Sequence, residues 1–363
     1  MFNEINMGIA FIVAFAGALI LTYPVKAFSI KIGAVDFPNH RKIHTKVTPR
    51  IGGIAIFLGA LAGALVLQPR HEHVPEILLG AIVIVITGAL DDRFGLRPVV
   101  KLTGQLIAAS FLVSDGLIIE YITLPLLGQV ELGFASVLVT VFWIVGITNA
   151  INLIDGLDGL ATGVSTIALS SMLVMALVDG RVAAAYLCIV LIGANLGFLY
   201  HNFYPAKIYM GDTGSNFLGF MIAAVSIMGL FKNITLFSFI IPVIVLAVPI
   251  FDTLFAIIRR AWNKEGIMTA DNKHIHYQLL AAGYSHRTTV LIIYAFSALF
   301  GGLAILFSYS SQTVAVLVTI LVLFLLHIFA EVAGIVMGGK RPVLSFIAGL
   351  FRQKRKHDDN GQS

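Results

Sequence analysis

The sequence predicts an all-α polytopic membrane protein with about eleven transmembrane helices, an N-terminus outside the cell and a cytoplasmic C-terminus. Three observations predict this fold. Hydrophobic residues make up 58% of the 363 residues and charged residues only 12%, too few to cover a soluble protein of this length. Apolar runs of membrane-spanning length recur along the chain. Lys and Arg also gather in alternate loops, as they do in multi-pass proteins.

Eleven apolar segments are candidate spans, because each approaches the ~20 residues that a helix needs to cross the hydrocarbon core. They are residues 5–23, 51–67, 77–90, 99–113, 134–151, 160–178, 182–200, 217–231, 234–258, 288–309 and 313–337. The ninth contains Pro242 and Pro249. Such interruptions are tolerated where protein or a wet cavity satisfies the freed backbone groups, so we expect a broken ninth helix.

The positive charges set the predicted orientation. With eleven spans, one set of loops holds 21 Lys and Arg residues, whereas the other holds only 3, Arg70, Arg181 and Lys232. Cytoplasmic loops carry this excess, so the rich set, which includes the C-terminal segment, is predicted to face the cytoplasm. The poor set includes residues 114–133, where alternating apolar residues around Pro125 and Gly128 predict a small outer hairpin.

We expect a single transmembrane domain over residues 1–351, followed by a basic and polar disordered cytoplasmic tail over residues 352–363. The basic run at residues 352–356 suits anionic lipid headgroups. The net charge of +5 therefore predicts membrane lipids, and no nucleic acid, as partners. The sequence leaves open whether the chain forms a homodimer.

A pair of carboxylates, Asp91 and Asp92, directly follows the third span. At a helix C-terminus they face the negative end of the helix dipole and repel each other. Positive charge is therefore expected beside them, either a metal ion or Arg93, Arg97 and Lys101. The alternative is a solvated pair that only ends the helix.

The segment from Asn152 to Gly159 reads Asn-Leu-Ile-Asp-Gly-Leu-Asp-Gly. If the fifth helix continues through it, Asn152, Asp155 and Asp158 share one edge, because residues three apart lie ~60° from one another. Such an oxygen-rich edge suits magnesium and phosphate, and the glycines permit close approach of a ligand. A polar turn between helices is the alternative.

Asp212 lies in the run Tyr-Met-Gly-Asp-Thr-Gly-Ser-Asn, residues 209–216, just before the eighth span. Glycines, hydroxyls and one carboxylate at a helix N-terminus predict a cradle for phosphate and metal. The alternative is a plain N-cap by Thr213 or Ser215.

His274 and His276 lie in the largest predicted cytoplasmic loop. They do not share a helix face, so a phosphate-facing pair is favoured over a two-histidine zinc site. Three charged or titratable groups lie deeper in the predicted spans. Asp252 is interpreted as either functional or structural, and His327 and Glu331 are four residues apart, so they can pair.

The four polar motifs share the predicted cytoplasmic side, and this grouping indicates their chemistry. Oxygen donors without cysteine favour magnesium over zinc, with manganese as the alternative ion. Magnesium beside basic residues indicates phosphate chemistry, which depends mainly on positioning and charge neutralisation.

In order and spacing, these motifs resemble the polyprenyl-phosphate N-acetylhexosamine-1-phosphate transferases of the glycosyltransferase 4 superfamily, over nearly the whole chain. The branch that moves phospho-N-acetylmuramoyl-pentapeptide typically reads Pro-Thr-Met-Gly-Gly after the first inner loop and carries three consecutive histidines. This chain reads Pro-Arg-Ile-Gly-Gly at residues 49–53 and His-Ile-His at 274–276. It therefore resembles the GlcNAc-1-phosphate branch, although Tyr277 stands where many members have a second histidine.

The resemblance implies an enzyme of the cytoplasmic membrane that transfers GlcNAc-1-phosphate from UDP-GlcNAc to undecaprenyl phosphate and releases UMP. Its product would begin a teichoic-acid-type or O-antigen-type polymer. By resemblance Asp212 is the Mg²⁺ ligand, with a contribution from Asn152, and Asp91 or Asp92 is a base or phosphate orienter. We favour an electrostatic and positioning role for this pair, because a phosphate monoester with a second pKa near ~6 is already largely ionised at neutral pH.

The resemblance also assigns the remaining contacts. Asp155 and Asp158 are expected to hold the nucleotide sugar, and Asn202 and Tyr209 to contact the nucleotide, where Tyr209 could stack on uracil. The candidates for phosphate neutralisation are Lys46, Arg50 and Lys101. His274 and His276 are expected to contact the diphosphate or the sugar.

Two alternatives remain. The donor could be UDP-MurNAc-pentapeptide or another UDP-HexNAc. The chain could instead be a secondary transporter or lipid flippase, because broken helices and buried charges suit transporters. Transporter sites, however, lie near the midplane of the membrane, whereas the acidic motifs of this chain are predicted to lie at one face.

Overall fold

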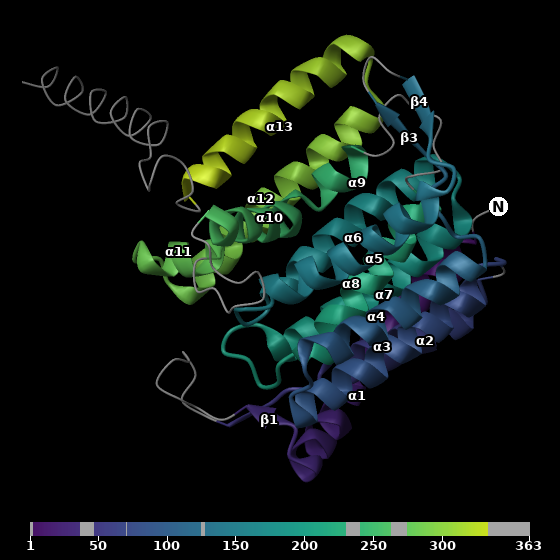
Figure 1. The fold of residues 1–363 in the computed structure, drawn as a ribbon. Helices are drawn as coiled ribbons and strands as arrows, with labels where there is room; N and C mark the ends of the chain where they lie inside the picture. The colour runs from purple at the N-terminus through teal and green to yellow at the C-terminus, as the bar shows by residue number, and fades with distance from the viewer. Residues whose placement is uncertain are drawn as a thin grey trace, which may run out of the picture.

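The computed structural model describes residues 3–36, 47–69, 71–124, 128–229, 240–262 and 274–332. These residues form a bundle in which most helices run side by side (Figure 1). The helices are α1 (Glu4–Ile32), α2 (Gly53–Leu67), α3 (Val74–Phe94), α4 (Pro98–Ser114), α5 (Ala135–Ile154), α6 (Leu160–Val178), α7 (Val182–Asn202), α8 (Gly211–Gly229), α9 (Ile240–Val245), α10 (Ala247–Trp262), α11 (Ile275–Ala281), α12 (His286–Ser308) and α13 (Gln312–Val332). Two short antiparallel ribbons complete the fold: β1 (Val35–Asp36) with β2 (Thr48–Pro49), and β3 (Tyr121–Leu124) with β4 (Gly128–Glu131).

The bundle has the properties of a multi-pass membrane protein. Seven described helices, α1, α3, α5, α6, α7, α12 and α13, are long and apolar enough to cross a bilayer, and α2 and α4 are shorter apolar helices. Large apolar side chains also point outward, such as Ile12, Phe142 and Leu317, as contact with lipid requires. The predicted all-α polytopic class is therefore confirmed. A helix overlaps each of the eleven predicted ranges, and the number of spans and their orientation stay predictions.

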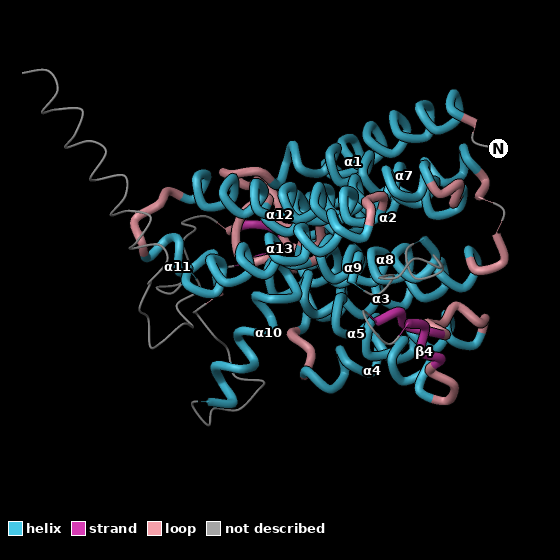
Figure 2. The backbone as a smooth tube through the Cα atoms, turned by 90° about the horizontal axis from the view of Figure 1, so that it is seen from above, coloured by secondary structure: helices cyan, strands magenta, loops and turns pink. Residues whose placement is uncertain are grey.

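The predicted break in the ninth segment is present. Helix α9 ends at Val245 and α10 starts at Ala247, with Leu246 between them. Pro249 has no N–H to donate to the carbonyl of Val245, so the helical ladder is interrupted at this point. Helix α10 then leans away from the bundle (Figure 2).

The predicted hairpin is also present, with Tyr121 paired to Glu131 and Ile122 to Val130. The predicted tail at residues 352–363 and the candidate Lys46 lie outside the described residues. The single domain predicted for residues 1–351 stays a prediction.

Small residues allow α1, α2 and α7 to pack closely. A Cβ on Gly59 of α2 would lie 2.7 Å from the backbone nitrogen of Ala18 and 2.9 Å from the carbonyl oxygen of Ala14, both on α1. A Cβ on Gly193 of α7 would lie 2.6 Å from the carbonyl of Phe11. In a membrane, no hydrophobic driving force brings helices together, because the lipid tails are also apolar. Small residues at helix crossings let the backbones approach closely and gain van der Waals contact.

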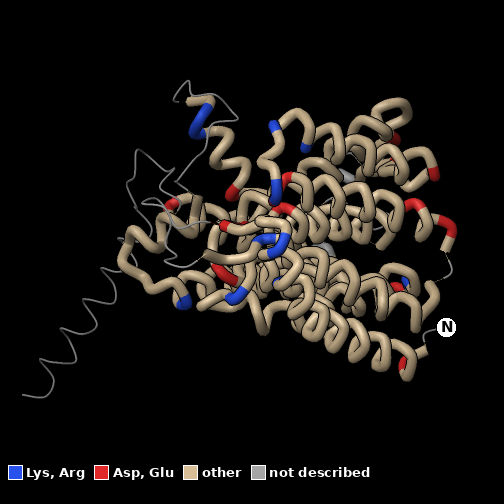
Figure 3. Tube along the Cα trace, turned by 90° about the horizontal axis from the view of Figure 1, so that it is seen from below, with Lys and Arg blue, Asp and Glu red and all other residues tan. Residues whose placement is uncertain are grey.

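The loops that carry the polar motifs meet at one end of the bundle. The β1–β2 ribbon and α11 lie at this end, whereas the N-terminus and the β3–β4 hairpin lie at the other (Figure 1). Most described Lys and Arg residues also gather at the end away from the N-terminus (Figure 3). We call it the polar end.

We expect Gly59→Ala to destabilise the protein, because its methyl group would force α1 and α2 apart. Overpacking of this kind typically costs about 1–3 kcal/mol, and the thermal unfolding of the detergent-purified protein should shift to lower temperature. Gly8→Ala in α1 is the matched control, because a Cβ there meets nothing within 4 Å. Equal unfolding temperatures for the two variants would contradict the close packing.

Candidate active site

A cavity of about 340 Å³ opens at the polar end of the bundle. Seven of the residues singled out in the sequence line it, although they come from four separate stretches of chain: Arg50, Asn152, Asp155, Asp158, Asn202, Tyr209 and Asp212. The structure therefore brings the phosphate, nucleotide and metal candidates together at one place.

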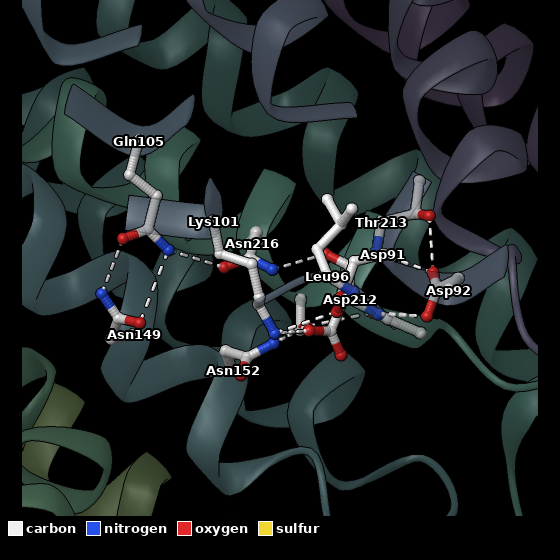
Figure 4. A network of polar contacts seen from close by, with 12 residues as sticks. Asp91, Asp92, Leu96, Lys101, Gln105, Asn149, Asn152, Asp212, Thr213 and Asn216 are labelled. Carbon is white, nitrogen blue, oxygen red and sulfur yellow. Dashed lines mark hydrogen bonds and ion pairs between the residues drawn. The ribbon is translucent and has the colours of Figure 1, made fainter. Parts of the chain in front are cut away.

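Asp92 anchors the start of helix α8. Its Oδ1 accepts a hydrogen bond of 2.9 Å from the backbone N–H of Asp212, and its Oδ2 accepts from the N–H and the hydroxyl of Thr213 at 2.9 and 2.6 Å. A carboxylate from α3 thus satisfies backbone donors that the first turn of α8 leaves open (Figure 4). The Asp92 side chain is fully buried, and its oxygens are committed to the protein rather than to the cavity.

Gly211 makes this contact possible. Its φ of 69° lies in the left-handed region that favours glycine. A Cβ at this position would also collide with the carbonyl of Arg50 and with the Asp92 carboxylate. Asp212 follows directly and lines the cavity.

Asp91 has different partners from Asp92, although the two are adjacent in the chain. Its Oδ1 accepts from the N–H of Leu96 at 2.7 Å, and its Oδ2 lies 2.9 Å from Nζ of Lys101. The same ammonium group pairs with Asp212. Lys101 is one of the positive groups expected beside the carboxylate pair, and it forms an ion pair with Asp91. Asp92 instead pairs with Arg50, which comes from another loop.

Arg50 is brought to the site by a short backbone ladder. The N–H of Tyr209 donates to Pro49 O at 2.8 Å, and the N–H of Gly52 donates to Tyr209 O at 3.0 Å. This ladder places Nε of Arg50 3.5 Å from Oδ1 of Asp92, and Nη2 3.8 Å from Oδ1 of Asp212. Arg50 and Lys101 therefore flank Asp212.

A network of amides holds the other side of α8. The side chain of Asn216 donates to the carbonyl of Asp212 at 2.8 Å and accepts from Gln105 of α4 at 3.1 Å. Asn149 of α5 donates in turn to Gln105 at 2.8 Å (Figure 4). The first turn of α8 is thus fixed from α3, α4 and α5 together.

The fifth helix does not continue through the Asn152–Asp158 motif. It ends at Ile154, and α6 begins at Leu160 after Gly159, whose φ is 77°. The continuous edge that a longer fifth helix would give is therefore not formed, and the alternative, a turn between helices, is the one that the structure has, because glycine here supports a turn. The turn nonetheless directs Asn152, Asp155 and Asp158 to the cavity.

The motif is tied to the other loops by two hydrogen bonds. The side chain of Asn152 donates to Oγ of Ser215 at 2.8 Å. Oδ2 of Asp158 accepts from the N–H of Ala206 at 2.9 Å. The segment between α5 and α6 is thereby joined to the segment that leads into α8.

Burial has the largest effect on the ionisation of Asp155 in the cavity. Burial, together with the negative charge of Asp212, raises the pKa of Asp155 to about 8, although Arg50 opposes this shift. Among the described residues, no three His, Cys, Asp or Glu side chains are close enough to hold a metal ion by themselves. Mg²⁺ is commonly held by one or two carboxylates plus substrate phosphates, so the oxygen donors of Asp212, Asn152 and Asp155 fit a site that the substrate completes.

The histidine motif approaches the site from α11. Nδ1 of His274 lies 2.8 Å from Oδ2 of Asp252, and the N–H of Ile275 donates to Oδ1 of Asp252 at 2.9 Å. Asp252 therefore positions the start of α11. The ring of His276 is buried against Gly156, where a Cβ would lie 3.1 Å from its Cδ2. Neither histidine is part of the cavity lining.

Several lining residues were not predicted. Tyr277, which was left out, lines the cavity with Tyr204 and His286. The rings of Tyr204 and His286 stack with centroids 4.3 Å apart, and Arg287 donates to the carbonyl of Tyr204 at 3.2 Å. Ser285 is a residue in the sequence that could have predicted the position of His286. Its side chain caps the start of α12, which places His286 at the polar end.

Asn202 lines the cavity, but its side chain accepts from Thr162 at 2.9 Å and donates to Ile208 O at 3.1 Å.

In α13, His327 and Glu331 form the expected pair, at 3.2 Å.

The fold and cavity define a polytopic membrane protein with a cavity at its polar end that carboxylates, an arginine and tyrosines line. Comparison with known proteins agrees with this class. The family model for glycosyl transferase family 4 matches residues 74–230. The chain is 47% identical to a Bacillus subtilis protein named as a probable undecaprenyl-phosphate N-acetylglucosaminyl 1-phosphate transferase, over 96% of this chain and 98% of the relative. It is 38% identical to the decaprenyl-phosphate N-acetylglucosaminephosphotransferase of Mycobacterium tuberculosis, over 83% of each chain.

A more distant relative is the undecaprenyl-phosphate alpha-N-acetylglucosaminyl 1-phosphate transferase of Salmonella typhimurium, 28% identical over 94% of each chain. The chain thus belongs to glycosyl transferase family 4, which confirms the resemblance that its motifs indicated. It is an enzyme of this family, and the transporter or flippase alternative is no longer favoured.

We expect Asp92→Asn to lower both stability and activity. The amide keeps the shape of the carboxylate but only one acceptor oxygen, so a buried donor of Asp212 or Thr213 loses its partner, at a cost of about 1–3 kcal/mol. Thermal unfolding and the turnover number report the two effects.

Asp91→Asn is the matched comparison for Asp92→Asn. It keeps the oxygen that accepts from Leu96, so it should lower activity with a smaller loss of stability. An Asp92→Asn protein as stable as the Asp91→Asn protein would argue against the anchoring role.

His276 should make the folded protein sensitive to acid. Burial lowers its pKa from 6.5 to about 4, so between these values the unfolded chain binds a proton that the folded protein excludes. Stability should therefore fall as the pH drops from 6.5 to 4, by about 3 kcal/mol from this group. In His276→Phe, the unfolding temperature should fall less steeply as the pH drops across this range. Identical slopes for the variant and the natural protein would contradict the assignment.

Proposed function

We propose that the protein transfers GlcNAc-1-phosphate from UDP-GlcNAc to undecaprenyl phosphate in the cytoplasmic membrane, and so forms the first lipid-linked intermediate of a cell-wall polymer of the teichoic-acid or O-antigen type. An oxygen of the lipid phosphate attacks the β-phosphorus of UDP-GlcNAc. The bond between this phosphorus and the bridging oxygen breaks, and UMP leaves with that oxygen. The product is a lipid-linked sugar pyrophosphate.

The observation that carries the proposal is the cavity itself. One space at the end of an apolar bundle gathers carboxylates, an arginine and tyrosines from distant segments. This position suits an enzyme that joins a water-soluble nucleotide sugar to a lipid whose tail stays in the membrane. The names of the relatives support both substrates, because each contains a polyprenyl phosphate and an N-acetylglucosaminyl phosphate group. A transporter site would be expected nearer the midplane.

We propose Mg²⁺ as the cofactor, with Mn²⁺ as a substitute. Asp212 and Asn152 would hold the ion, Asp155 would contribute, and the diphosphate would complete the site. When bound, such an ion neutralises the charge that develops on the phosphates.

The basic residues of the site provide the other positive charges. Arg50 and Lys101 lie on either side of Asp212 and are suited to orient the two phosphate groups. Asp91 holds the Lys101 ammonium, and because the lipid phosphate is already ionised at neutral pH, we assign Asp91 this electrostatic role rather than that of a base.

The nucleotide is assigned to the wall formed by the turn after α5 and the segment before α8. Asp158 and Tyr209 line that wall, and burial together with the charge of Asp158 raises the pKa of Tyr209 to about 12. Its ring is proposed to stack on uracil. His274 and His276 are proposed to shape the sugar end of the cavity from behind its lining.

We also propose the full topology of eleven spans, with the N-terminus outside and the C-terminus in the cytoplasm. The distribution of described Lys and Arg residues supports it (Figure 3), since positive charge marks the cytoplasmic side. The cavity then faces the cytosolic pool of nucleotide sugar.

The direct test is UMP release by the purified protein with undecaprenyl phosphate as the acceptor. We expect release with UDP-GlcNAc and Mg²⁺, loss of release with EDTA, and recovery with added Mg²⁺ or Mn²⁺. Asp212→Asn is the matched negative control.

Release with UDP-MurNAc-pentapeptide, and not with UDP-GlcNAc, would overturn the donor assignment. Full activity in EDTA would overturn the metal assignment.

A further inference from the structure

A second polar cavity lies at the end of the bundle opposite the active site. It measures about 320 Å³ and lies between the segment that leads into α3 and the start of α7. On the proposed topology this end faces outward. The two cavities have no lining residue in common.

This outer cavity has the chemistry of an anion site. Arg181, His71 and His73 line it, together with the first turn of α7, Val182 to Ala184, which carries the positive end of the helix dipole. Among the described residues that line the cavity, none is acidic. Behind the lining, Asp115 holds Nδ1 of His73 at 2.5 Å and Glu72 lies 3.6 Å from its Nε2.

An apolar groove of about 360 Å³ begins where the outer cavity ends. The two spaces share Pro69. Along α7, the cavity is lined by Val182, Ala183, Ala184 and Tyr186. The groove is lined by Leu187, Val190 and Leu191 on the following turns. The surface thus changes along one helix from a polar cavity that Arg181 lines to an apolar groove.

The deep end of the groove is closed by two aromatic rings. Phe57 of α2 and Phe217 of α8 both line the groove and meet edge to face, with centroids 5.5 Å apart. A chain that enters beside Pro69 would therefore end against this pair. Along the sides, Ala60, Ala64 and Ala81 leave the width that a chain requires.

We propose that the outer cavity and the groove together bind one phospholipid with an anionic headgroup. Its phosphate would occupy the cavity beside Arg181 and the start of α7, and one acyl chain would lie in the groove. The complementary charge at one end and the continuous apolar surface at the other favour this occupant over a soluble anion. The site is independent of the transfer reaction proposed above.

The test is lipid retention by the purified full-length protein, measured by native mass spectrometry after exchange into detergent with phosphatidylglycerol or phosphatidylcholine. We expect one phosphatidylglycerol to be retained preferentially. Arg181→Gln should weaken its binding about tenfold, because one charge-assisted contact is worth about 1.4 kcal/mol or more. Arg181→Lys should retain most of the binding.

Two further experiments distinguish the contribution of the headgroup to binding from that of the acyl chain. Ala64→Phe fills the groove and should weaken phosphatidylglycerol binding while the protein still releases UMP. Soluble glycerol phosphate should raise the unfolding temperature far less than phosphatidylglycerol does. Arg93→Gln, a cation at the polar end that lies over Phe94, is the matched control and should leave retention unchanged.

Several results would overturn the proposal. These are unchanged retention in both Arg181→Gln and Ala64→Phe, equal retention of the two lipids, or equal stabilisation by glycerol phosphate. If Arg181→Gln does not fold, Ala64→Phe and the lipid comparison in the natural protein still decide the outcome.

Discussion

The candidate active site depends on the contact between the Asp92 carboxylate and the first turn of α8. Two backbone N–H groups and one hydroxyl converge on this one side chain, and Asp212 is the residue whose N–H is held. The position of Asp212 in the cavity thus follows from a carboxylate that is itself buried. Removing a buried ion from its partners is costly, so this contact has little freedom to rearrange during the reaction.

The other features of the site are arranged around that contact. Arg50 balances the charge of Asp92 from one loop, and the Asn216–Gln105–Asn149 amides hold α8 from two further helices. Lys101 connects Asp91 to Asp212. Asp155 and Asp158 also line the cavity, and burial, followed by the charge of Asp212, raises the pKa of Asp155. A substrate that brings both a divalent ion and phosphates would balance this charge, so the site is best suited to bind the two together.

Much of the fold could be predicted, because membrane helices are encoded by local composition. The apolar segments, the break near Pro249 and the hairpin around Gly128 each depend on a few neighbouring residues, and all were found. The candidate site was located by motifs, and most of its members line one cavity. The different roles of Asp91 and Asp92 could not be predicted, because they depend on partners such as Thr213 that lie more than a hundred residues away. Whether α5 continues or ends near Ile154 stayed open, because Gly156 and Gly159 suit both the close approach of a ligand and a turn. Tyr277 was left out because many family members have a histidine at that position, and His286 was missed because only the folded chain brings it to the cavity beside Asp158.

We infer that Asp92 organises α8 from inside the protein and does not touch the reacting groups. The most direct measurement is a cryo-electron microscopy structure of the purified enzyme with UDP-GlcNAc and Mg²⁺. We expect the Asp92 oxygens to keep their hydrogen bonds with the N–H groups of Asp212 and Thr213, while the diphosphate lies against Asp212. An Asp92 oxygen bound to the metal ion or to a phosphate of the donor would contradict it.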